Sequence, residues 1–121
     1  MSQKILLVED EKNIIIALKL CLINYGYEVL LAEDGITAVE TALKELPDLV
    51  LLDIIIPKLN GFLVCEALKE NDLTKGIPII MLSAKAQEED IKKARDCGAS
   101  EYLVKPLKPE ELIKQIKKYT E

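Results

Sequence analysis

The chain has 121 residues, of which half are hydrophobic and 31% are charged, and its formal net charge is -5 at pH 7. This length suits one domain with a single core, and the acidic balance argues against nucleic-acid contact by this domain, because phosphate backbones demand a basic surface. No apolar run nears the roughly 18 residues of a membrane span, and the acidic N-terminal stretch "MSQKILLVEDE" is unlike a signal peptide. We therefore expect a globular, cytoplasmic protein without membrane contact.

Five short apolar runs alternate with five helical patterns along the chain. The predicted strands cover residues 4–8, 28–32, 49–53, 79–82 and 101–104, and their nearly continuous apolar character is typical of strands covered on both faces. The predicted helices run from about Asn13 to Tyr25, from Asp34 to before Pro47, from about Gly61 to Glu70, from about Gln87 to Gly98, and from Pro109 to the C-terminus. Asp34 suits an N-cap, Gly98 the position after a helix end, and Pro109 a first helical position.

Strict alternation of strands and helices predicts an α/β fold with a parallel sheet, right-handed crossovers and five helices distributed over both faces. Five such units fit the doubly wound, flavodoxin-like strand order 2-1-3-4-5, although alternation alone leaves the order open. The chain is too short for an eight-stranded α/β barrel.

The three cysteines are widely spaced, and the chain contains no histidine. Cys21, Cys65 and Cys97 form no C-x-x-C pair, and each lies within an apolar helical pattern or at its end. We interpret them as reduced structural thiols. The absence of histidine excludes His-based catalytic triads and His metal ligands.

Polar residues follow four of the predicted strands at their carboxyl ends, the edge where doubly wound folds bind ligands. Glu9 and Asp10 follow the first strand, Asp53 ends the third, Ser83 follows the fourth and Lys105 follows the fifth. Three crowded carboxylates repel one another and require a cation, and oxygen ligands favour Mg²⁺ or Mn²⁺ over Zn²⁺. Each residue alone has an ordinary explanation, such as a helix cap or a turn. Their conjunction at one edge indicates phosphoryl transfer onto a carboxylate, with the lysine and the serine placed to contact a phosphate.

Four segments resemble the response-regulator receiver domain of two-component signalling, in its single-domain, chemotaxis-regulator form. They are "ILLVEDE" near the start, "LVLLDIIIPKLNGF" in the middle, "IPIIMLSAK" on the fourth strand and "GASEYLVKPLKPEEL" near the end. The resemblance spans the whole chain. It implies that residues 1–121 form one receiver domain, with no output domain in this chain.

The resemblance also implies roles for the residues at the predicted edge. Asp53 would be the phosphoacceptor. Mg²⁺, or Mn²⁺, would be held by Asp53 and Asp10 directly, by Glu9 through water, and by the backbone carbonyl of Ile55. Lys105 would pair with Asp53 before phosphorylation and with the phosphoryl group afterwards.

The family pattern extends to the switching residues. Ser83 would hydrogen-bond a phosphoryl oxygen, Tyr102 would turn inward as Ser83 moves, and Pro106 would follow a cis peptide bond. Ile55 and Lys85 stand at the two positions where the family controls the access of water to the phosphoryl group. Neither offers a group that orients water, which favours slow to moderate dephosphorylation.

The resemblance implies a histidine kinase or histidine phosphotransfer protein as the partner, docking on the first helix. That helix is apolar on two sides. Its core stripe is predicted to be Ile14, Ala17, Leu18, Cys21, Leu22 and Tyr25, and a second stripe of Ile15, Ile16, Leu20 and Ile23 is predicted to provide the exposed docking surface. The alternative is a helix that is buried more deeply than usual. The fourth helix, fifth strand and fifth helix would carry the output toward an unknown protein target.

The function implied is a phosphorylation-dependent signalling switch that is not a classical enzyme but catalyses its own aspartyl phosphorylation and dephosphorylation. A phosphatase or mutase with an aspartyl nucleophile would need a second acid at the position of Ile55. A flavin-binding electron carrier would need a glycine- and hydroxyl-rich loop where this chain has "VEDEKN". A receiver-like interaction scaffold that works without phosphate is the remaining alternative.

Overall fold

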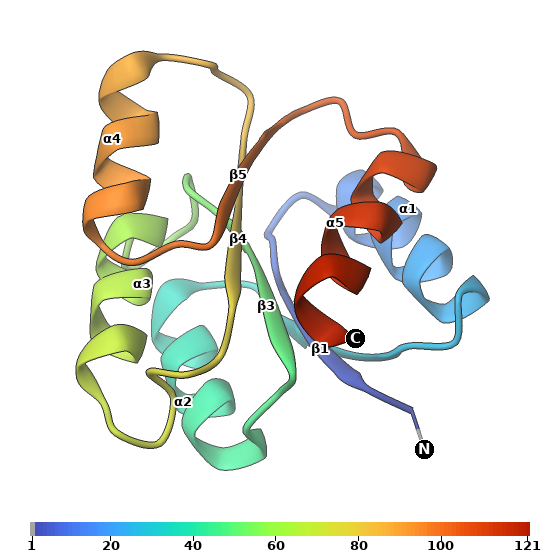
Figure 1. Ribbon diagram of the computed structural model, residues 1–121, viewed down its shortest axis with the longest axis horizontal. Coiled ribbons are helices and arrows are strands. Elements are labelled where there is room, and N and C mark those ends of the chain that lie inside the picture. Colours follow the sequence, from blue (N-terminus) through green and yellow to red (C-terminus); the bar gives the residue numbers. More distant parts are fainter. Residues whose placement is uncertain (1) are drawn as a thin grey trace.

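The computed structural model describes residues 2–121, which form a parallel sheet of five strands with helices on both faces (Figure 1). The strand order is β2-β1-β3-β4-β5, which confirms the predicted doubly wound topology. The elements are β1 (Lys4–Val8), α1 (Lys12–Asn24), β2 (Glu28–Ala32), α2 (Gly35–Glu45), β3 (Leu49–Asp53), α3 (Gly61–Glu70), β4 (Ile79–Ser83), α4 (Glu88–Asp96), β5 (Glu101–Val104) and α5 (Pro109–Thr120).

Alternate residues along the central strands point to opposite faces of the sheet, where they build two separate cores. Leu6 and Val8 of β1 pack with residues of α2, α3 and α4, whereas Ile5 and Leu7 pack with residues of α1 and α5. Figure 1 shows the same division, with α1 and α5 on one side of the sheet and the other three helices opposite. Because both faces are covered, β1, β3 and β4 are apolar at almost every position.

The two edge strands differ from the expectation that every strand is fully covered. Leu31 of β2 and Val104 of β5 are exposed, and most other residues of these strands are only partly buried. An edge strand has a neighbour on one side only, so the helices cover it incompletely.

The predicted helix ends lie within about two residues of the observed ones because they depend on local chemistry. The Asp34 side chain accepts a hydrogen bond from the Thr37 backbone N–H at 2.7 Å, as expected of an N-cap. Gly98 has a positive φ of 97° after the end of α4, and Pro109 opens α5.

The stripe predicted to bury α1 is confirmed at Leu18 and Leu22 and, with partial burial against the core, at Ile14 and Cys21, but it is wrong at Ala17 and Tyr25. The buried residues are Ile15, Leu18 and Leu22, whereas Ala17 and Tyr25 are exposed. Ile15, which we expected in the exposed stripe, is only 8% exposed and is therefore not part of a docking surface. The polar residues Lys12, Asn13, Lys19 and Asn24 are all exposed, but apolar residues are exposed among them, so the apolar pattern alone does not mark the edge of the buried face.

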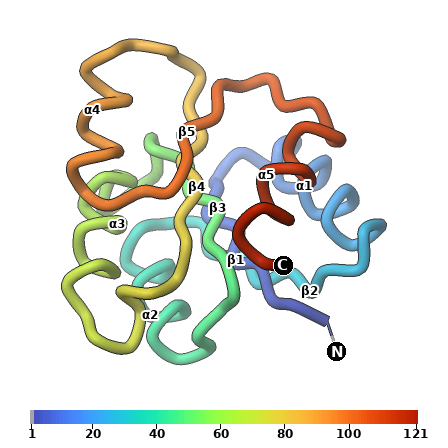
Figure 2. Tube along the Cα trace, in the orientation of Figure 1, coloured from blue at the N-terminus to red at the C-terminus, as the bar shows by residue number. Residues whose placement is uncertain are grey.

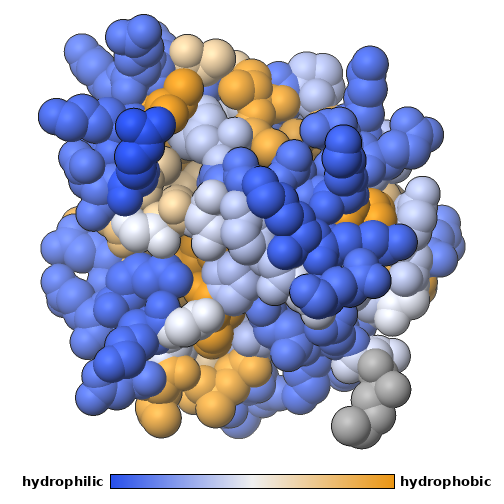
Figure 3. Space-filling model, in the orientation of Figure 1, coloured by the Kyte–Doolittle hydropathy of each residue, from blue (hydrophilic) through white to orange (hydrophobic). Residues whose placement is uncertain are grey.

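The rest of the second stripe on α1 is exposed. Ile16 is 58% exposed, Leu20 57% and Ile23 50%. The face of the molecule in Figure 3, by contrast, is mostly hydrophilic, with small apolar patches between charged side chains.

Within residues 2–121, none of the helices is both long and apolar enough to span a bilayer.

The loop from β3 to α3 returns tightly onto the end of β3. The Gly61 backbone N–H donates to the Ile54 carbonyl at 2.8 Å, and a Cβ atom at Gly61 would lie 2.7 Å from the Asp53 carbonyl oxygen. Only glycine permits this approach without displacing the backbone. The turn fixes the end of β3, where Asp53 projects.

Candidate functional site

Strand register brings four of the predicted site residues to one edge of the sheet. Val8 of β1 is the register partner of Leu52 in β3, so the residues that follow, Glu9 and Asp53, are neighbours. Ser83 of β4 is aligned with Val104 of β5, and Lys105 comes directly after Val104. The carboxyl ends of β1, β3, β4 and β5 therefore deliver their polar groups to one place.

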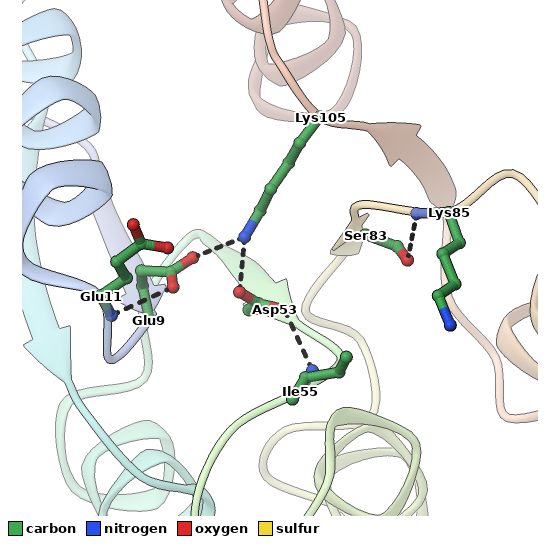
Figure 4. Close-up of polar contacts among 7 residues, drawn as sticks. All are labelled: Glu9, Glu11, Asp53, Ile55, Ser83, Lys85 and Lys105. Carbon is green, nitrogen blue, oxygen red and sulfur yellow. Dashed lines mark hydrogen bonds and ion pairs between the residues drawn. The ribbon is translucent and has the colours of Figure 1, made fainter.

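Lys105 joins two buried carboxylates at the centre of this site (Figure 4). Its Nζ atom lies 2.6 Å from Asp53 Oδ2 and 3.0 Å from Glu9 Oε2. Glu9 is 1% exposed and Asp53 is 6% exposed. The other Asp53 oxygen, Oδ1, accepts a hydrogen bond from the Ile55 backbone N–H at 3.0 Å. Asp53 is thus held from both sides in one orientation.

The ammonium group of Lys105 does not fully compensate the two carboxylates. Burial works to lower the pKa of Lys105, but its hydrogen bonds to Asp53 and Glu9 outweigh burial and raise it. Burial, followed by the hydrogen-bonded proximity of Asp53, raises the pKa of Glu9 to about 7 despite the opposing effect of Lys105. The site therefore has an excess of negative charge when both carboxylates are ionised.

The site opens into a depression of about 430 Å³ that is accessible from solvent. Asp10 lines it but is exposed and lies outside the buried contact between Lys105 and the two carboxylates. Ile55, at 74% exposure, stands at the rim. The full lining consists of Glu9, Asp10, Glu11, Asp53, Ile55, Ser83, Ala84 and Lys105.

The donor atoms of this depression fit Mg²⁺. Four carboxylates, from Glu9, Asp10, Glu11 and Asp53, share it with a single lysine, so a divalent cation would balance part of the remaining charge. Within residues 2–121 no group of three acidic or thiol side chains is arranged to enclose a metal ion by itself. Mg²⁺ does not need such a cage, because it binds through one or two carboxylates and keeps several waters. Carboxylate and backbone oxygen atoms of the depression would therefore supply some of the Mg²⁺ ligands, and water molecules would supply the others.

Ser83 and Tyr102 are connected through the main chain of Lys85. The Lys85 backbone N–H donates to Ser83 Oγ at 3.1 Å, and its carbonyl accepts a hydrogen bond from the Tyr102 hydroxyl at 2.7 Å. Ser83 is 6% exposed, and the half-buried Tyr102 ring packs against the core beneath α4. The Lys105–Pro106 peptide bond is cis, which is the geometry implied by the resemblance.

Two contacts of the site were not predicted from the sequence. Glu9 contacts Lys105 directly, and the Lys85 main chain bridges Ser83 and Tyr102. The first had a signal in the sequence. Glu9 extends the β1 ladder by donating its backbone N–H to the Ala32 carbonyl, so the period-2 alternation of the strand turns its side chain inward. Backbone bridges such as that of Lys85 have no side-chain signature.

The family model of the response regulator receiver domain matches residues 5–117. Among curated proteins, the chain is 41% identical over 117 residues to the alkaline phosphatase synthesis transcriptional regulatory protein PhoP of Bacillus subtilis, covering 97% of this chain and 48% of PhoP. The chain thus spans about half the length of the curated relatives it matches.

Two solved structures resemble the fold over nearly their whole length. The chemotaxis protein CheY4 of Vibrio cholerae is 32% identical with a TM-score of 0.93, and the match covers 98% of this chain and 99% of that one. The receiver domain of the sensor histidine kinase PA1611 of Pseudomonas aeruginosa is also 32% identical, with a TM-score of 0.93 and coverage of 99% and 98%. That structure holds a magnesium ion in its active-site cleft.

Proposed function

The chain belongs to the response regulator receiver family of two-component signalling, and from that premise we propose that residues 1–121 act as a phosphorylation-dependent switch with Asp53 as the phosphoacceptor. A histidine kinase or histidine phosphotransfer protein supplies the phosphoryl group. Receivers of this family are signalling domains and not classical enzymes. In this proposal the chain catalyses the transfer onto itself and the later hydrolysis.

The contact between Asp53 and Lys105 is the observation that carries the proposal. A buried carboxylate is costly unless it is paired, and here one oxygen is paired with an ammonium group at 2.6 Å beside an open depression. An Asp53 oxygen attacks the phosphorus atom and forms an O–P bond. The P–N bond to the partner histidine breaks, and the released imidazole nitrogen takes up a proton from solvent. Lys105 then pairs with the phosphoryl oxygens.

The carboxylates of the depression, including that of Asp53, would also hold the metal ion. Asp10 and Asp53 would bind Mg²⁺ directly, the Ile55 carbonyl would complete the protein ligands, and Glu9 would act through water. Mg²⁺ supplies neutralisation of the phosphoryl oxygens during transfer. Mn²⁺ would bind to the same oxygen ligands.

The hydrogen-bond chain through Lys85 supports a route from the phosphoryl group to the surface. Phosphorylation adds a charge of about -1.5 to -2 beside Ser83. The Ser83 hydroxyl rotates to donate to a phosphoryl oxygen and gives up its contact with the Lys85 N–H. The Lys85 carbonyl, which holds the Tyr102 hydroxyl, shifts with it. Tyr102 is released to turn inward, and the surface of α4, β5 and α5 changes.

We place partner docking on the exposed apolar stripe of α1. Ile16, Leu20 and Ile23 follow one another at spacings of four and three residues, which is the seam of a helix that packs on another helix. A phosphohistidine on a partner helix would then lie near the depression at the start of α1. Ile15 takes no part, because it is buried.

The test is intact mass spectrometry after incubation with Mg²⁺ and acetyl phosphate. We expect the wild type to gain one phosphoryl group and to lose this gain when a chelator removes the metal. Asp53→Asn should gain none. Asp72→Asn is the matched control, because the Asp72 side chain is 91% exposed and contacts only Lys75.

Phosphoryl gain by Asp53→Asn would overturn the assignment of the acceptor. If the wild type gains nothing from acetyl phosphate, the same experiment is repeated with phosphohistidine-bearing kinase as donor. Failure with both donors, together with absent Mg²⁺ binding, would favour the phosphate-independent scaffold over the switch.

A further inference from the structure

Two cysteines that lie far apart in the sequence meet where α3 packs against α4. Cys65 is in the middle of α3, and Cys97 caps the C-terminal end of α4. The Cys65 Sγ atom donates to the Cys97 carbonyl oxygen at 3.3 Å, and the Cys97 Sγ atom donates to the Ala94 carbonyl at 3.2 Å. Figure 2 shows the two helices side by side. The third cysteine, Cys21, belongs to the core on the opposite face of the sheet.

The two thiols differ in their access to solvent. Cys65 is 0% exposed, whereas Cys97 is half-buried. Cys97 lines an open groove of about 510 Å³ between α3 and α4, together with Phe62 and Lys69. A small oxidant therefore reaches Cys97 from the groove, whereas Cys65 has no exposed surface.

The surroundings also differ in their effect on reactivity. Burial, and then the contact with the Cys97 thiol, raise the pKa of the Cys65 thiol, and the nearby ammonium group of Lys69 opposes this only in part. Cys65 is therefore protonated at neutral pH and slow to react with an oxidant by itself. Any first oxidation of the pair takes place at Cys97.

We propose that Cys65 and Cys97 are an oxidisable pair that hydrogen peroxide converts into an internal disulfide linking α3 to the end of α4. The Cys65 sulfur already contacts the main chain of Cys97. The 3.3 Å contact makes the two residues direct neighbours, and the disulfide requires both side chains to rotate so that their sulfur atoms meet.

The chemistry proceeds in two steps. The Cys97 thiolate attacks one peroxide oxygen, the O–O bond breaks, and the products are a sulfenic acid and hydroxide. The Cys65 sulfur then attacks the Cys97 sulfur, the S–O bond breaks, and the leaving hydroxide takes the Cys65 proton to form water. In sum, two thiols and one peroxide give one disulfide and two waters. The sulfur atoms are oxidised and the peroxide oxygens are reduced.

The position of the cross-link gives it a consequence for signalling, and this part rests on the proposed function. The bond would hold the end of α4 against α3 and restrain the surface that phosphorylation is proposed to change. It would also be slow to reduce. Attack on the accessible Cys97 sulfur must expel Cys65, and a thiol with a raised pKa is a poor leaving group.

The experiment exposes dilute, unphosphorylated wild-type protein to hydrogen peroxide, removes the peroxide with catalase, unfolds the protein and alkylates it with N-ethylmaleimide. Intact mass and peptide mapping then give the state of each cysteine. We expect one alkylated thiol, Cys21, and one linked pair of peptides containing Cys65 and Cys97. Treatment with dithiothreitol before alkylation should restore three alkylated thiols.

Two variants sharpen this result. Cys21→Ser should give the same linked peptides with no alkylated thiol. Cys97→Ser should leave Cys65 alkylatable after peroxide, because the first oxidation site has been removed. Three alkylated thiols in oxidised wild type, sulfinic acid at Cys97 beside a free Cys65, or a bond to Cys21 would each overturn the proposal. None of these readouts involves phosphate, so failure here is distinct from failure of phosphorylation at Asp53.

Discussion

Lys105 and Lys69 are both partly withdrawn from solvent, but their surroundings affect the two ammonium groups in opposite directions. Lys105 faces the carboxylates of Asp53 and Glu9, which raise its pKa above the usual value in spite of burial. Lys69 donates to the carbonyl oxygens of Lys75 and Ile77 at 3.0 Å and 2.7 Å, and burial lowers its pKa.

The difference separates a reactive arrangement from a structural one. Neutral carbonyl groups satisfy the hydrogen bonds of Lys69, and the result is a fixed loop after α3. The carboxylates of Asp53 and Glu9 give Lys105 acidic partners, and in the proposed function the lysine exchanges this contact for one with the phosphoryl group. Substitutions at the two sites should therefore affect different properties, in the following order of size.

Replacing Lys105 should have the largest effect on phosphorylation. We expect Lys105→Met to slow phosphorylation by acetyl phosphate by about 10²-fold, because it removes a preorganised positive charge from the phosphoryl oxygens. Lys69→Met should leave the rate unchanged. Time courses by mass spectrometry, with folding checked by circular dichroism, measure both. Equal rates for the two variants would mean that the charge of Lys105 has no special role in phosphoryl transfer.

Replacing Glu9 should change how stability depends on pH in metal-free buffer. Its pKa is about 7 in the folded protein, above the ordinary value of 4.5, so the folded state holds the proton more tightly than the unfolded state. The contribution of Glu9 to the free energy of unfolding is then greatest below about pH 4.5 and declines as the pH rises to about 7.

Glu9→Gln should remove this decline. The difference in the free energy of unfolding between Glu9→Gln and wild type should therefore shift in favour of the variant by about 1–3 kcal/mol as the pH is raised from about 5 to about 8. Urea unfolding of both proteins at these two pH values, with chelator present, gives the comparison. A parallel pH dependence in the two proteins would show that Glu9 is not the titrating group. Added Mg²⁺ should reduce the difference at the higher pH.

Replacing Lys69 should affect stability and leave the chemistry intact. Lys69→Met leaves the Lys75 and Ile77 carbonyl groups without their side-chain donor, and we expect a loss of about 1–2 kcal/mol in the free energy of unfolding. Lys75→Met is the matched control, because the Lys75 side chain is 61% exposed and pairs only with Asp72. Equal unfolding midpoints in urea for the two variants would contradict the structural role of Lys69.

The smallest effect is expected at the link between the site and the surface. Tyr102→Phe removes one hydrogen bond to the Lys85 carbonyl and should cost about 0.5–1 kcal/mol in unfolding free energy. Its phosphorylation rate should match wild type, because Tyr102 does not contact Asp53. A large fall in that rate would mean that the hydroxyl contributes to the chemistry and not only to the switch.

The sequence alone determined the α/β fold and the polar groups at its carboxyl edge. The β-α alternation and the apolar strands define a parallel sheet, and the residues after each strand necessarily gather at one edge. The caps at Asp34 and Gly98 could be read from the chain because they depend on hydrogen bonds and backbone angles within a few residues. The order of strands and helices is therefore enough to predict that Glu9, Asp53, Ser83 and Lys105 lie together.

Only the tertiary structure decided matters that depend on packing between distant elements. The burial of Ile15 and the exposure of Ala17 follow from how α1 lies on the sheet, because a helix with apolar residues on both its buried and its exposed side does not define the edge of the buried face. The alternation of β1 turns Glu9 inward, but its contact with Lys105, 96 residues away in sequence, depends on how far the lysine side chain reaches across the end of the sheet. The meeting of Cys65 and Cys97 depends on the packing of α3 against α4, because neither residue has a local pattern that predicts the other.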